Sequence, residues 1–147
     1  MCRHAAYYEQ IGADLEVVKW VRNGYEMKLK EWPLDSFTKN NRSATEDPHF
    51  VWHELRRLVV LGVMSEVQEK PRVVNALSVV FSNKKRLVWD VREINSLIEV
   101  EKLNLESLDD AAELLEENFF GATSDLEAGY FQVGLAEEQK TLLGCAF

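Results

Sequence analysis

The chain has 147 residues, a length that suits a single domain. Hydrophobic residues make up 46 %, including four Trp and seven Phe, so there is enough apolar material for a packed core. No apolar run approaches the roughly 20 residues of a membrane helix, the N-terminus lacks the apolar stretch of a secretory signal, and the formal net charge of −8, taken alone, argues against nucleic-acid binding.

The two cysteines, Cys2 and Cys145, stand at opposite ends of the chain. This spacing suggests a disulfide only weakly, and the reducing interior of a cell fits better. We therefore expect an intracellular protein with no membrane partner.

Charge is unevenly distributed along the chain. From position 70 to 92 one acid, Asp90, stands among the bases Lys70, Arg72, Lys84, Lys85, Arg86 and Arg92. From 99 to 117 one base, Lys102, stands among the acids Glu99, Glu101, Glu106, Asp109, Asp110, Glu113, Glu116 and Glu117. The pattern predicts a basic hairpin followed by an acidic helix.

In the first third of the chain, the apolar spacing over Ile11–Val21 predicts a short helix, and Asn23-Gly24 is a turn signal. The polar stretch Pro33–Pro48 predicts a loop. A second helix begins after Asp47, which suits an N-cap, with Pro48 at its first position.

The apolar residues of this second helix recur at helical spacing and define one buried stripe: Val51, Leu55, Leu58 and Val59. Gly62 is its natural end. His49 and His53 have the i, i+4 spacing of zinc ligands, but no cysteine or further histidine lies near, so a zinc site is not expected.

Strands follow. Val63–Val67 predicts a short strand, and the β-branched runs Val73–Phe81 and Lys85–Val91 predict two longer ones. Ser82-Asn83-Lys84 is a tight connection, so the longer runs should pair as an antiparallel hairpin. A helical turn is expected from Arg92.

In the last third, Ser107-Leu-Asp-Asp110 resembles a capping box and predicts another helix. The runs Asn118–Leu126 and Thr141–Phe147 predict strands. Asp125 then ends an apolar strand, and Gly129 follows it, where backbone can approach a ligand closely. Carboxylate oxygens in such a place suit Mg²⁺, although an isolated Asp here is more often a simple turn cap.

Three blocks of sequence together resemble the reverse transcriptases. Asp-Leu-x-x-Gly-Tyr-x-Gln from Asp125 is similar to their first catalytic motif, and Val74–Val80 and Lys85–Asn95 are similar to their fingers hairpin and the helix after it. The blocks occur in family order. The resemblance covers roughly 20–147, and Trp20-Val-Arg-Asn-Gly-Tyr25 looks most like retrotransposon enzymes of the DIRS type.

The resemblance implies an α+β fold and an RNA-directed DNA polymerase that transfers deoxynucleotides to a primer 3′-hydroxyl. It divides the chain into an N-terminal extension (1–48), the fingers (49–117) and the start of the palm (118–147). The implied partners are an RNA or DNA template-primer and deoxynucleoside triphosphates, and the implied cofactor is Mg²⁺, with two ions in the complete enzyme.

The resemblance also implies residue roles. Asp125 would bind both metals, with the Leu126 carbonyl as a ligand to one of them. Ala128 and Gly129 would donate backbone N–H groups to the triphosphate, Tyr130 would exclude a 2′-hydroxyl, and Arg86 with Lys85 or Lys84 would reach the triphosphate from the hairpin. Arg92 and Asn95 would lie near the template.

Each of these residues also has a simpler interpretation. The three basic residues of the hairpin tip could be solvated, Tyr130 could be a core aromatic, and Arg92 could form a surface ion pair with Asp90 or Glu93. The functional interpretation is favoured because the motifs occur together.

The sequence departs from the family where Ala76 and Gly134 replace frequent prolines and the hairpin tip lacks the common glycine. Phe147 also comes before the family's Tyr-x-Asp-Asp motif and its thumb. The chain alone should therefore be inactive as a polymerase. The alternative is a catalytically dead, retroelement-derived interaction module.

Overall fold

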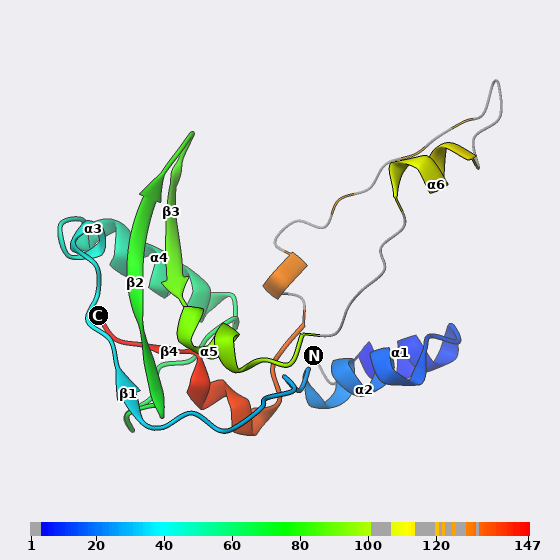
Figure 1. Ribbon diagram of the computed structural model, residues 1–147, viewed down its shortest axis with the longest axis horizontal. Coiled ribbons are helices and arrows are strands. Elements are labelled where there is room, and N and C mark those ends of the chain that lie inside the picture. Colours follow the sequence, from blue (N-terminus) through cyan, green and yellow to red (C-terminus); the bar gives the residue numbers. More distant parts are fainter. Residues whose placement is uncertain are drawn as a thin grey trace.

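A computed structural model describes residues 4–100, 107–113, 120, 122, 125, 129–131 and 133–147 of the chain. Figure 1 shows a small sheet with helices beside it, so the described part mixes helix and sheet, which is compatible with the expected α+β class. None of the described helices is long and apolar enough to cross a membrane.

Two helices lie near the N-terminus. Helix α1 (Ala5–Gln10) precedes the range Ile11–Val21, and α2 (Leu15–Asn23) covers most of it. Asp14 starts α2 by accepting a hydrogen bond from the Glu16 N–H at 2.7 Å. The short helix predicted near Ile11–Val21 is thus present as α2, which starts later than predicted because the aspartate cap begins the helix there, after a turn through Gly12 at φ 72°.

Gly24 ends α2 with φ 88°, which bears out the turn signal. A Cβ at this position would lie 2.3 Å from the Leu135 carbonyl oxygen. Only glycine therefore allows the N-terminal segment to come this close to the C-terminal one.

The sheet is built around β2 (Val73–Phe81). Its first half pairs in parallel with β1 (Ser36–Phe37) and β4 (Gly144–Cys145), and its second half pairs antiparallel with β3 (Lys85–Asp90). The β2–β3 register runs from Ala76 opposite Asp90 to Phe81 opposite Lys85, which confirms the predicted hairpin. Strands from 1–48, from 49–117 and from 118–147 thus meet in one sheet.

Helix α4 (Pro48–Val60) follows the short α3 (Arg42–Thr45) and packs against the hairpin. Asp47 caps α4 through the Phe50 N–H, as predicted. The buried residues Val51 and Leu55 form a core cluster with Leu77 of β2. A second cluster joins distant parts of the chain: Met27, Val73, Ile94 and Leu142.

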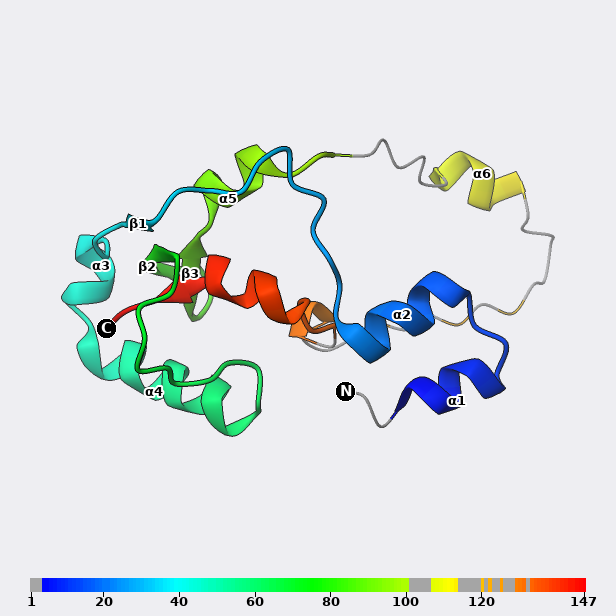
Figure 2. The same ribbon diagram turned by 90° about the horizontal axis from the view of Figure 1, so that it is seen from below.

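Helices α5 (Arg92–Leu97) and α6 (Leu108–Glu113) occupy the positions expected for them. At α6 the Ser107 N–H donates to the Asp110 carboxylate at 2.7 Å, and the Asp110 N–H donates back to Ser107 Oγ at 3.2 Å, so the capping box is present. Figures 1 and 2 show α6 apart from the sheet, so this described part of the acidic helix does not lie beside the basic hairpin.

Two strand predictions differ from the structure, and a third lies mostly outside the described residues. Val63–Val67 starts with a bend and contains no strand. Of Asn118–Leu126 the structure describes 120, 122 and 125, none of which lies in a strand. Thr141–Phe147 is largely not a strand either, because the 3-10 helix η3 (Glu137–Leu142) extends into it and only β4 is extended. Short apolar runs are ambiguous because a buried helical turn and a buried strand have similar composition.

Candidate functional site

Lys85 lies on the face of the hairpin that packs against α4. Its Nζ forms an ion pair with the Asp47 carboxylate and lies 5.8 Å from the centroid of the Phe50 ring. The hydrogen bond from Lys85 lowers the pKa of Asp47 below its ordinary value. Lys85 therefore ties the hairpin tip to the first turn of α4.

Arg86 lies on the opposite face, because neighbouring side chains of a strand alternate between faces. It is exposed and stands opposite Val80. Among the described residues its guanidinium has no ion-pair or hydrogen-bond partner. Two half-exposed apolar side chains, Val80 (48 %) and Val88 (41 %), lie on the same face. The structure thus separates the two residues that the resemblance assigned to one triphosphate.

Arg92 is occupied by a neighbour. Its Nε and Nη2 atoms donate to the two carboxylate oxygens of Asp90 at 2.7 and 2.6 Å, and these bonds lower the pKa of Asp90. The pair is the surface ion pair that the simpler interpretation named, and such exposed pairs contribute little to stability. A template phosphate would have to compete with Asp90 for Arg92.

Asn95 is exposed on α5. The helix is fixed by Ile94, whose side chain is buried in the second core cluster. Asn95 therefore projects from an anchored helix that begins two residues after β3 ends.

The motif around Asp125 is only partly described. Asp125 is exposed and not in a strand, and Leu126 and Ala128 lie outside the described residues. Gly129 is half-buried and begins the 3-10 turn η2 (Gly129–Phe131). Tyr130 belongs to this turn, but its side chain is not among those described.

Two Mg²⁺ ions need several converging oxygen ligands. In the parts of the chain that the structure describes, no three His, Cys, Asp or Glu side chains come together as a metal site would require. Asp125 is a single carboxylate, so the described residues do not fit two Mg²⁺ ions by themselves.

Two buried amide side chains that the sequence did not single out hold the C-terminal segment in place. Gln139 accepts from the Met27 N–H at 2.7 Å and donates to the Met27 carbonyl at 2.8 Å, as a neighbouring strand would. Asn75 donates to the carbonyls of Leu142 at 3.0 Å and Gly144 at 3.1 Å. A polar residue within the apolar run of β2 was the available signal for Asn75, because buried amides require partners. Gln139 has no such signal.

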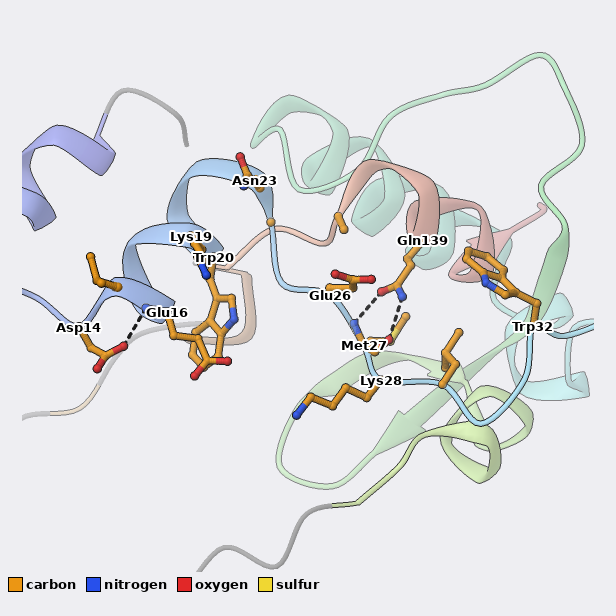
Figure 3. Close-up of a pocket in the computed structure, with 14 residues that line it drawn as sticks. Asp14, Glu16, Lys19, Trp20, Asn23, Glu26, Met27, Lys28, Trp32 and Gln139 are labelled. Atoms are coloured by element: carbon orange, nitrogen blue, oxygen red, sulfur yellow. Dashed lines mark hydrogen bonds between the residues drawn. The ribbon is translucent and has the colours of Figure 1, made fainter.

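An open groove of about 840 Å³ lies between α2, the segment 24–32 and η3. Figure 3 shows two tryptophans of its lining, Trp20 and Trp32, at opposite sides of the Met27–Gln139 contact. Its lining contains side chains of both charges: Asp14, Glu16, Lys19, Glu26 and Lys28. This mixed lining favours no single charge of ligand.

No family model, curated protein or solved structure matches this chain. The reverse transcriptase interpretation therefore depends on the sequence motifs and on the chemistry of the residues themselves.

Proposed function

We propose that this chain is the fingers and early palm part of a retrotransposon RNA-directed DNA polymerase, which extends a primer on an RNA or DNA template. The observation that carries the proposal is Arg86: it is exposed near the tip of an antiparallel hairpin and has no partner among the described residues. The motif from Asp125 to Gln132 supports it from the sequence.

A free arginine suits a triphosphate. The planar guanidinium donates two parallel hydrogen bonds to phosphate oxygens, and it stays charged at every physiological pH. Among the described residues Arg86 has no carboxylate partner that it would have to leave before binding phosphate, whereas Arg92 would first have to leave Asp90. Arg86 is thus the better phosphate ligand of the two.

Lys85 supports this arrangement from the other face. Its ion pair with Asp47 and the packing of Leu77 against α4 hold the hairpin on a helix of 13 residues. In this proposal Lys85 orients the hairpin and leaves the triphosphate to Arg86. That role differs from direct nucleotide binding by Lys85, which the resemblance implied.

Nucleotide transfer itself depends in this family on two Mg²⁺ ions, which stabilise charge on the attacking and leaving oxygens. Because the described residues offer them one carboxylate, Asp125, what we propose for this chain by itself is binding of the nucleotide and not its transfer. Transfer would need the remaining carboxylates of the family's Tyr-x-Asp-Asp motif.

Binding can be tested by titrating the chain with deoxythymidine triphosphate and following its backbone amides by NMR. We expect the hairpin amides of β2 and β3 to shift, and Arg86→Ala to abolish the shift. Arg57→Ala is a matched control, because Arg57 is exposed but paired with Glu54. Equal shifts in the parent and in Arg86→Ala would contradict the proposal, and no shifts at all would favour the interaction module.

A further inference from the structure

The solvent side of α4 carries a set of residues that the proposed polymerase does not use. His49, Trp52, His53, Arg56 and Val60 are spaced by three or four residues, so they share one face of the helix. All five are exposed, whereas the opposite face is buried against the sheet. We call this set the α4 outer face.

Trp52 is the aromatic residue of this face and lies at its edge, beside half-buried Val59. It is 48 % exposed, and its ring meets Phe147 edge to face, with centroids 6.0 Å apart and planes at 79°. Such a contact restricts the indole without covering it. A large aromatic ring is therefore held at the surface on a rigid helix.

Arg56 lies one turn after Trp52 and is exposed, with no ion pair or hydrogen bond to any described residue. The one acid of α4, Glu54, is engaged by Arg57 at 2.9 Å and also lies 3.3 Å from Nδ1 of His53. The α4 outer face thus carries one cation, Arg56, that is unpaired among the described residues, although the chain as a whole has a net charge of −8.

We propose that the α4 outer face binds single-stranded nucleic acid, with a base stacked on Trp52 and a phosphate at Arg56. An exposed ring next to a free cation fits a strand that alternates bases and phosphates, and every base has a π face for stacking. A duplex hides those faces, so the site selects single strands. The hairpin residue Arg86 takes no part in it.

The charge of the whole chain sets a limit that can be measured. The net charge of −8 repels a polyanion at long range, so binding should depend on a few local contacts. For single strands each phosphate contact contributes about −0.7 to the slope of log K against log salt. We therefore expect a shallow slope, and Arg56→Ala should reduce it by about one such step.

The experiment is fluorescence anisotropy of a labelled oligothymidine of roughly 16 nucleotides, within the range of single-strand sites. We expect Trp52→Ala to weaken binding about tenfold, as loss of one stacked base does, and Trp52→Phe to retain most of the affinity. Trp32→Ala is the matched control, because Trp32 is equally exposed (50 %) but lies in the groove. Arg57→Ala is the matched control for Arg56→Ala.

Several outcomes would overturn the proposal. The parent chain could fail to bind, or Trp52→Ala and Arg56→Ala could bind like the parent. Weakening by Arg86→Ala alone would place the strand on the hairpin, which would refute this site and leave the proposed polymerase standing. The parent could also form a dimer that Trp52→Ala dissociates, while the affinity for the oligonucleotide stays unchanged. That result would assign the α4 outer face to contact with a second copy of the chain. As a control, circular dichroism is used to check that each variant is folded before its binding is compared with that of the parent.

Discussion

Replacing Gln139 by alanine should destabilise the whole fold, although no catalytic role is assigned to this residue. The side chain is buried and makes both of its hydrogen bonds to the backbone of Met27, 112 positions earlier in the sequence. It is a tertiary link between the N-terminal segment and the start of the expected palm.

The magnitude follows from what the alanine leaves behind. The N–H and the C=O of Met27 would both lose their partner in a buried place, and each unsatisfied group costs about 1–3 kcal/mol. Against this, alanine avoids the conformational entropy that the glutamine side chain loses on folding, up to about 2 kcal/mol. The net loss of unfolding free energy is therefore about 3 kcal/mol, or about 10 °C in Tm for a chain of this size.

The assay is urea unfolding followed by circular dichroism, with hydrogen exchange of the Met27 amide as a local readout. Glu138→Ala is the matched control, because Glu138 precedes Gln139 in the same 3-10 helix but is exposed. An exposed substitution should change the unfolding free energy by no more than about 0.5 kcal/mol. The Met27 amide should exchange faster only in Gln139→Ala.

Unfolding of the two variants at the same urea concentration would refute this reasoning. It would mean that the Met27–Gln139 contact contributes nothing to the folded state.

Three further predictions follow from the hairpin and the motif. Lys85→Ala should raise the pKa of Asp47 towards its ordinary value in a carboxyl NMR titration. Because the pKa of Asp47 is lowered in the folded state, its stabilisation is present above the ordinary pKa and is lost as pH falls through the pKa of the folded state. An unchanged titration would exclude the ion pair in solution. The chain alone should show no template-directed synthesis in primer extension. Steady incorporation of deoxynucleotides would contradict the expectation that synthesis needs the carboxylates of the Tyr-x-Asp-Asp motif. In a version extended through the Tyr-x-Asp-Asp segment and thumb, Asp125→Asn should slow polymerisation roughly a hundredfold, which is about 3 kcal/mol of activation free energy. Tyr130→Ala should keep polymerisation and admit ribonucleotides. A parental rate for Asp125→Asn would show that the site is wrongly assigned.

Much of the local structure could be predicted from the sequence. Helix α4 is encoded by Asp47, Pro48 and an apolar stripe, all within a few residues of one another. The β2–β3 hairpin follows from two β-branched runs and a tight connection. These elements were predictable because caps, turns and hydrophobic periodicity act between near neighbours.

The candidate site was predictable only in part. Strand alternation alone places Lys85 and Arg86 on opposite faces. Which face meets α4 depends on the packing of Leu77 and its neighbours. That packing decides that Lys85 is paired and that Arg86 has no partner in the described part of the chain. The partner of a charged side chain is a property of the folded surface, because it depends on what the rest of the chain brings near.

The C-terminal segment shows the same division most clearly. Its sequence determined that Leu142 would be buried, because an apolar side chain of this size gains from leaving water. Only the tertiary structure decided that Leu142 enters the core from a 3-10 helix and that Gln139 satisfies the backbone hydrogen bonds of Met27. A short apolar run fits a strand or a helical turn equally well, so the choice is made by the hydrogen-bond partners that distant segments supply.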